Sequence, residues 1–286
     1  MSIPGNRVLA SEQMAGYREL GFVHSVPILT PDEVRYFRDQ IEKAWSALGG
    51  RVTRADGLHL FFRWAWDLAT HPRLLDCLED LLGPVIVLRH TRIFYKYPRS
   101  AAWVGWHQDG YTEHFSDPKV PAIWLGLTDA TVENGCLRVV PRSHRLGMLS
   151  HRLRLTQRDL ARSSTSDHEP GSADGDDNEL SVKLAKVPEG LDAPFDVVMK
   201  AGEMSFHHPL ALHGSNPNAS AQPRIGLSAT YSTPGHHRNG TAVALVRGSV
   251  GPRPGFPLSS KPADLPLEEA VVAFRASGRQ LLYAPS

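Results

Sequence analysis

The spacing of apolar side chains in the first third of the chain is typical of helices. Thr30-Pro31-Asp32-Glu33 combines the residues of a capping box with proline at the first helical position, so a helix is predicted to begin there. The residues after it place apolar side chains three or four positions apart, and this stripe predicts a face buried in the core. The stripe consists of Val34, Phe37, Ile41, Ala44 and Trp45. Two more helices are predicted: a short one over 11–20, which Gly21 ends, and one over 71–82, which a Gly-Pro pair ends.

From residue 85 onward the pattern changes to short runs of β-branched and aromatic residues. Runs of this kind predict strands, and they lie at 85–97, 122–128, 136–140, 196–206 and 224–231. Helices followed by many short strands predict a mainly β fold with flanking helices, whose core is a double-stranded β-helix, a cupin-like jelly roll. A proline-rich linker at 251–257 precedes one last short helix at 267–276.

We therefore expect a single domain over 1–286. Its N-terminal helices would occupy 10–83, its jelly-roll core 85–245 and its tail 246–286. A stretch at about 156–183 interrupts the core and holds almost no apolar side chains, so it cannot offset the entropy of ordering and is predicted to be a flexible surface insert. A lid over an active site is the alternative, because long loops in compact domains are often functional.

Composition narrows the classes of function. A formal charge of +1 over 286 residues gives no electrostatic reason to bind nucleic acid or a membrane surface. No apolar run approaches ~18 residues, and the first residues lack the apolar core of a signal peptide. Cys77 and Cys136 are too few for a disulfide scaffold. We expect a cytoplasmic protein whose partner is a small molecule, and its oligomeric state stays open.

Candidate chemistry begins with His107 and Asp109, which lie two residues apart in the segment 103–110. On a strand, side chains alternate between faces, so these two would point the same way. An imidazole and a carboxylate are two thirds of the 2-His-1-carboxylate triad, which holds non-haem Fe(II) and leaves coordination positions open. A His-x-Asp pair also arises by chance in surface loops, and the prediction therefore depends on a third ligand.

The third ligand is predicted to be His213, one of three histidines in the segment 201–215. It precedes a turn-forming run, and ten residues separate it from Arg224, which opens a strand-like run. A guanidinium near a metal can hold the far carboxylate of a chelating dicarboxylate, and a surface salt bridge is the alternative role. His207 and His208 are predicted to be core histidines or to support the site without binding the metal.

At these positions the sequence resembles the phytanoyl-CoA dioxygenase family of Fe(II)/2-oxoglutarate-dependent oxygenases. The family's motif is His-x-Asp, a distal His, then ten residues and Arg, and it matches His107, Asp109, His213 and Arg224. The segment 133–144 is similar to a second family segment, with Arg142 where glycine is usual. The resemblance extends over roughly residues 10 to 240.

This resemblance implies an iron-dependent hydroxylase that uses 2-oxoglutarate and O2. It implies that the triad holds Fe(II) and that Arg224 pairs with the 5-carboxylate of 2-oxoglutarate. Further candidates for lining the co-substrate site are Arg92, Gln108 and Trp124. The segment 199–203 also resembles a branch of carrier-dependent halogenases, in which a small residue replaces the carboxylate. The presence of Asp109 therefore favours hydroxylation.

The expected substrate is a small polar metabolite of specialised metabolism, either free or tethered to a carrier protein. An acyl-CoA would require a dense block of basic residues, and no such block flanks the motifs. Substrate contacts are expected from Tyr111, His114 and His236, each of which could instead be a surface residue. Two alternatives stay open: a cupin-type metalloenzyme that does not use 2-oxoglutarate, and a non-catalytic binding member of the family.

Overall fold

The computed structural model describes residues 8–113, 120–153, 182–234, 242–251 and 256–284. Most of the predicted insert lies outside these residues, as do the substrate candidates His114 and His236. Among the described residues the strands form a large sheet, a four-stranded small sheet and a separate two-stranded sheet. This arrangement of facing sheets confirms the predicted jelly roll.

The large sheet has the strand order β1-β10-β5-β12-β3-β13-β14, and β2 joins it by pairing with both β3 and β15. Its strands are β1 (Phe22–Pro27), β2 (Val52–Asp56), β3 (Ile86–Lys96), β5 (Ala122–Gly126), β10 (Glu203–His207), β12 (Arg224–Ser232), β13 (Val243–Arg247), β14 (Leu258–Ser259) and β15 (Leu281–Tyr283). The small sheet has the order β4-β11-β6-β9. Its strands are β4 (Val104–His107), β11 (His213–Ser215), β6 (Leu137–Val139) and β9 (Phe195–Val197). The separate pair is β7 (His151–Leu153) and β8 (Val182–Leu184).

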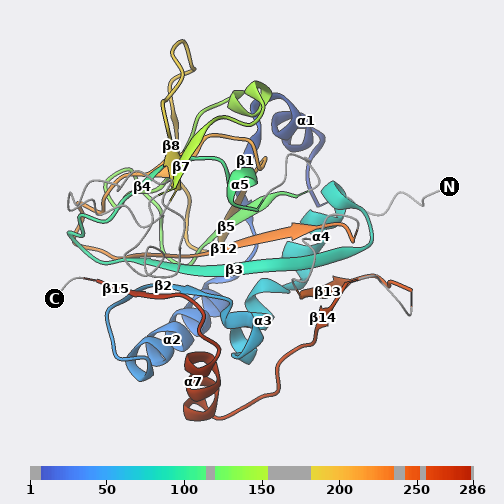
Figure 1. Ribbon diagram of the computed structural model, residues 1–286, viewed down its shortest axis with the longest axis vertical. Coiled ribbons are helices and arrows are strands. Elements are labelled where there is room, and N and C mark those ends of the chain that lie inside the picture. Colours follow the sequence, from blue (N-terminus) through green and yellow to red (C-terminus); the bar gives the residue numbers. More distant parts are fainter. Residues whose placement is uncertain (1–7, 114–119, 154–181, 235–241, 252–255, 285–286) are drawn as a thin grey trace, which may run out of the picture.

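Helices cover the outer face of the large sheet. In Figure 1, α2, α3 and α7 lie on one side of β2 and β3, while β4, α5 and β7 lie on the other side. The helices are α1 (Ser11–Leu20), α2 (Pro31–Ala47), α3 (Arg63–Ala69), α4 (Pro72–Leu82), α5 (Asp109–Glu113) and α7 (Leu267–Ala276), with short 3-10 turns η1 (Leu58–Leu60) and η2 (Ser143–Leu146). The helices bury apolar side chains against alternate residues of the strands, such as Ile93, Leu125, Phe206 and Leu227. Within the described ranges, no helix is both long and apolar enough to cross a membrane.

The inner face of the large sheet is polar, because the residues between those apolar positions carry hydrogen-bonding side chains. Register partners across β2, β3, β12, β5 and β10 form two rows on this face. One row is Asp56, Arg92, Ser228, Trp124 and Ser205, and the other is His90, Thr230, Ala122 and His207. Trp124 packs with Leu137 and Val139 of the small sheet, so this face looks toward the second sheet. The polar side chains of this face are therefore enclosed between the two sheets.

The local signals for the helices predict their ends well. The helices at 11–20 and 71–82 are confirmed, and Gly21 ends the first in the left-handed region at φ 87°. Thr30 caps α2 by accepting the Glu33 N–H, and the predicted apolar stripe is buried. The run at 196–206 is two strands, β9 and β10, because a turn through Gly202 separates them.

Arg142 has a backbone that suits glycine, since its φ is 60°. A residue with a side chain is strained in this left-handed region. Its ion pair with Asp192 (2.8 Å) lies at the surface and contributes little. We expect Arg142→Gly to raise Tm by about 2 °C, measured by calorimetry. Arg142→Ala is the control, because it removes the ion pair and keeps the strain. Equal shifts in the two variants would contradict the assignment of strain.

Candidate metal and co-substrate site

The register of the small sheet brings two histidines together. His107 on β4 and His213 on β11 are antiparallel partners, and their ring centroids lie 4.0 Å apart. Side chains at such positions start about 5 Å apart and leave on the same face. Strand pairing, and not closeness in sequence, therefore creates this half of the site.

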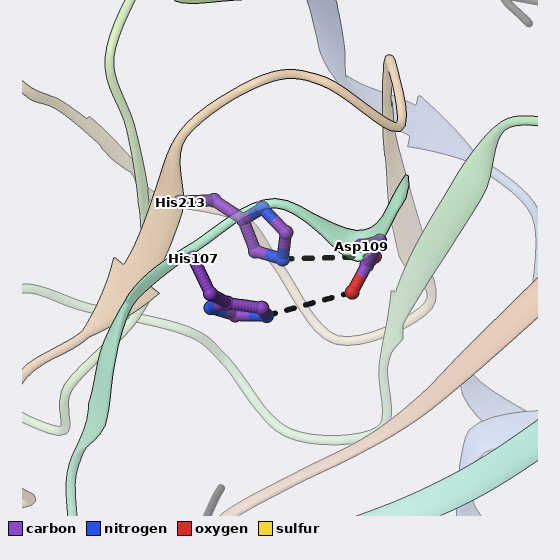
Figure 2. A group of neighbouring side chains, drawn as sticks. All are labelled: His107, Asp109 and His213. Atoms are coloured by element: carbon purple, nitrogen blue, oxygen red, sulfur yellow. Dashed lines mark ion pairs between the residues drawn. The ribbon is translucent and has the colours of Figure 1, made fainter. Parts of the chain in front are cut away.

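Asp109 reaches the two histidines from a turn. The prediction that it shares a strand with His107 is wrong, because β4 ends at His107 and α5 begins at Asp109. The Gly110 N–H donates to the Pro209 carbonyl (2.8 Å), and this contact holds the turn beside the segment before β11. Figure 2 shows the result: the Asp109 Oδ1 lies 3.4 Å from the His107 Nε2, and its Oδ2 lies 3.6 Å from the His213 Nε2.

The hydrogen bonds of both rings leave their Nε2 atoms free for a cation. The His107 Nδ1 lies 2.8 Å from the Gly105 carbonyl, and the His213 Nδ1 lies 3.0 Å from the Ala211 carbonyl. A carbonyl at this distance fixes the proton on Nδ1, so the neutral ring presents a lone pair at Nε2. Two such lone pairs and the Asp109 carboxylate face one another. Because all three are electron-rich acceptors that repel one another, a cation between them would stabilise the arrangement.

The dimensions of this donor set fit a metal ion. The three ligand atoms all lie within 4.8 Å of one another. Adjacent ligands of an octahedral ion with bonds of ~2.1 Å stand about 3 Å apart, slightly less than the 3.4 Å between the His107 Nε2 and the Asp109 Oδ1. Two imidazoles and one carboxylate are also the donors of the iron-binding facial triad. The residues present therefore fit Fe(II).

The pKa values of His213 and Asp109 favour the protonation states that metal binding requires. Burial, followed by the adjacent His107 and His207 rings, holds the pKa of His213 well below its ordinary value, so the ring is neutral. Burial alone would raise the pKa of Asp109, but the adjacent imidazoles of His213, His107 and His207 outweigh it and hold that pKa well below its ordinary value. Metal ligands bind as neutral imidazole and carboxylate, so little proton competition is expected.

Two buried cations lie side by side at another part of the inner face. Arg224 and Lys96 are register partners on β12 and β3, with exposures of 2% and 0%. The Arg224 Nη1 donates to the Gly135 carbonyl (2.7 Å), and the Lys96 Nζ donates to the Ser215 hydroxyl (2.7 Å). Two neighbouring buried cations favour an anion between or beside them. The sequence reasoning missed Lys96, although its place at the end of the strand that also carries Arg92 was a usable signal.

Trp124 lies beside this cationic pair. Its ring centroid is 5.0 Å from the Arg224 guanidinium carbon, and the indole crosses Gly226. A Cβ at Gly226 would lie 2.3 Å from the ring, so only glycine leaves room for it. This position agrees with the predicted lining role of Trp124, which stays a prediction.

Gly226→Ala should therefore displace the indole and disturb the cationic pair. Overpacking of this kind costs about 1–3 kcal/mol of stability, so we expect a lower Tm and a higher KM for 2-oxoglutarate. Gly16→Ala is the matched control, because a Cβ there meets nothing within 4 Å. Unchanged Tm and KM in Gly226→Ala would show that the indole can move freely.

The other predicted side chains have different surroundings. The Gln108 amide donates to the carbonyls of Gly147 (2.8 Å) and Leu210 (2.7 Å), so it braces β4 against two loops. Arg92 lies 3.4 Å from Asp56 on the inner face. Tyr111 stacks on His151 with centroids 4.3 Å apart. The co-substrate roles of Gln108 and Arg92, and the substrate role of Tyr111, stay predictions.

Curated proteins with known activities resemble this chain. It is 26% identical over 242 residues to the methylphosphonate hydroxylase of Gimesia maris, with 79% of this chain and 82% of that protein covered. It is 30% identical over 207 residues to the L-proline trans-4-hydroxylase of Streptomyces griseoviridis, with coverage of 66% and 72%. Both relatives are hydroxylases by name.

A solved structure and a family profile agree with these relatives. The apo form of the non-heme monooxygenase ThoJ has a TM-score of 0.69 and 27% identity, with 92% of this chain and 93% of that chain covered. The profile of the family described as Phytanoyl-CoA dioxygenase (PhyH) matches residues 17–226 and so includes every ligand of the candidate metal site. The chain belongs to the phytanoyl-CoA dioxygenase (PhyH) family.

Proposed function

We propose that this protein hydroxylates an unactivated carbon of a small polar metabolite, with Fe(II) as its metal and with 2-oxoglutarate and O2 as co-substrates. It is a non-haem iron dioxygenase that depends on 2-oxoglutarate, as are the enzymes of its family. The observation that carries this conclusion is the buried cluster of His107, Asp109 and His213 between the two sheets. The bound iron supplies the oxidation, in which one oxygen atom enters the substrate while 2-oxoglutarate becomes succinate and carbon dioxide.

The protein's own residues hold and orient the reactants. His107, Asp109 and His213 would hold Fe(II) from one side, and 2-oxoglutarate and oxygen would bind it from the other. We assign to Arg224, with its neighbour Lys96, the far carboxylate of 2-oxoglutarate, because a buried guanidinium makes a strong, directed pair with a carboxylate. The surrounding sheets bury the metal ligands, and this exclusion of water strengthens each of these electrostatic contacts.

A polar cluster on the inner face supports a polar substrate. Arg54 makes two bonds of 2.8 Å to Asp56, and Arg92 approaches the same carboxylate. His90 also faces it, with a pKa held well below its ordinary value, chiefly by burial. These charged and polar side chains line one part of the inner face, which suits a polar substituent. The members of this cluster on β3, Arg92 and His90, lie roughly 14 Å from His207, since three strand spacings of ~4.8 Å separate β3 from β10.

The relatives named above act, by their names, on methylphosphonate and L-proline, which supports a small polar substrate. A carrier-tethered form stays within the proposal. A reducing compartment such as the cytoplasm is proposed as well, because Cys77 and Cys136 are both buried free thiols. The assignment to specialised metabolism is part of the same proposal.

The test is a screen for substrate-stimulated succinate formation, with Fe(II), 2-oxoglutarate and oxygen present. Small polar acids and amino acids, their carrier-tethered forms and phytanoyl-CoA would be compared, and products would be examined for a mass gain of one oxygen. We expect stimulation by a small polar compound. Efficient turnover of phytanoyl-CoA would overturn the substrate class. Oxidation of a substrate without succinate release would favour a cupin-type enzyme instead.

A further inference from the structure

A third histidine reaches the metal cluster from the opposite sheet. His207 lies on β10, which pairs with β1 and β5 inside the large sheet, and the residue is only 3% exposed. Its ring centroid is 4.1 Å from that of His213, and its Nε2 lies 3.2 Å from the Asp109 Oδ2. Through this contact the large sheet touches a cluster whose two histidine ligands belong to the small sheet.

The surroundings of Nδ1 distinguish His207 from the two proposed ligands. In His107 and His213 a backbone carbonyl holds the proton on Nδ1 and leaves Nε2 as a lone pair. The Nδ1 of His207 is buried and has no hydrogen-bond partner within the described ranges. No carbonyl therefore fixes its proton there, and a proton on Nε2 is the arrangement that uses the nearby Asp109 carboxylate.

We propose that His207 is a positioning residue whose Nε2–H donates to the Asp109 Oδ2 and holds the carboxylate in its ligating orientation. This inference rests on the proposed iron site. The bond occupies Oδ2 and leaves Oδ1, which lies 3.4 Å from the His107 Nε2, turned toward the metal. Hydrogen bonds to the ligands of a metal commonly change its affinity 10- to 100-fold when they are removed. His207 thus acts on the metal through Asp109.

Three substitutions separate this role from metal ligation and from simple packing. His207→Gln places an amide N–H at the position of Nε2 and keeps the donor. His207→Asn places its amide at the position of Nδ1, too short to reach Asp109. His207→Leu fills the space without a donor. The Gln and Asn variants form a matched pair, because both carry an amide and differ only in its position. Thermal melting of each variant establishes that it folds.

The measurement is the affinity of each metal-free protein for Ni(II), by calorimetric titration without 2-oxoglutarate. We expect His207→Gln to stay within about threefold of the wild type, and the Asn and Leu variants to bind about 10- to 100-fold more weakly. Weak binding by Gln and Leu alike would overturn the proposal, since the imidazole itself would then be a ligand. Equal affinity in all variants would also overturn it and leave only a packing role. A wild-type protein that binds no Ni(II) would overturn the iron site as well.

Discussion

Replacing His213 with alanine is expected to abolish both metal binding and substrate-stimulated succinate formation. The change leaves one imidazole and one carboxylate, which cannot hold the metal on one side of an open site. Metal catalysis supplies several kcal/mol, so turnover should fall on the order of a thousandfold or more. Asp109→Ala should have the same effect, because it removes the only anionic ligand proposed for the metal. The measurements are Ni(II) affinity and succinate release.

His208→Asn is the control for this experiment. His208 is also buried in the same segment, and its Nδ1 accepts the Leu210 N–H at 3.0 Å, a bond that the asparagine oxygen can replace. We expect this variant to keep its metal and its activity. Retention of Ni(II) by the His213→Ala variant would instead make His207 the second imidazole ligand.

Arg224→Gln should raise the KM for 2-oxoglutarate at least about 30-fold, with a much smaller effect on the KM for the substrate. The glutamine keeps a polar amide, but it removes the positive charge and ends short of the Gly135 carbonyl that the Arg224 Nη1 contacts. Losing one member of a buried charged pair costs about 2–5 kcal/mol, and each 1.4 kcal/mol is a factor of ten. Initial rates over a range of 2-oxoglutarate concentrations give the measurement.

Two further variants test whether this effect is specific to the buried cations. Lys96→Met should shift the same parameter in the same direction, because Lys96 is the register partner of Arg224. Arg138→Gln should leave it unchanged, since Arg138 pairs with Asp196 at the edge of the small sheet and is partly exposed. An unaltered co-substrate requirement in Arg224→Gln would return this residue to a structural role.

The sequence predicts elements whose signals are local and misses those whose signals are not. The capping box at Thr30 and the glycine at the end of α1 act within a few residues, so both helix ends were predictable. The helix α3 was missed because most of its residues are buried, including Trp64, Ala65 and Trp66, so it has no polar stripe to mark a period. The strands β2 and β15 are marked only by their pairing with distant segments.

The same division applies to the site. Residue types and the spacing to Arg224 identified the candidate metal ligands, and the structure brings the three together. The departure of Asp109 from the strand depends on its neighbour's bond to Pro209, which no local pattern reveals. Lys96 was missed because lysine is rarely buried. Gln108 was linked to the co-substrate because its neighbours are ligands, yet its amide contacts loops whose positions only the fold defines.

The pairing of His107 with His213 also bears on how such enzymes can diversify. Because side chains alternate along a strand, a shift of one residue in the register between β4 and β11 would turn one histidine away. Insertions or deletions that shift this register would therefore be eliminated by selection. Among the described residues, β7 and β8 form a sheet of their own, in which Leu153 and Val182 are register partners, so the end of one strand lies beside the start of the other. Longer or shorter loops there would incur little entropic penalty and leave the register of the histidines intact. Evolution can therefore alter the neighbourhood of the site at this junction while the inherited iron chemistry stays the same.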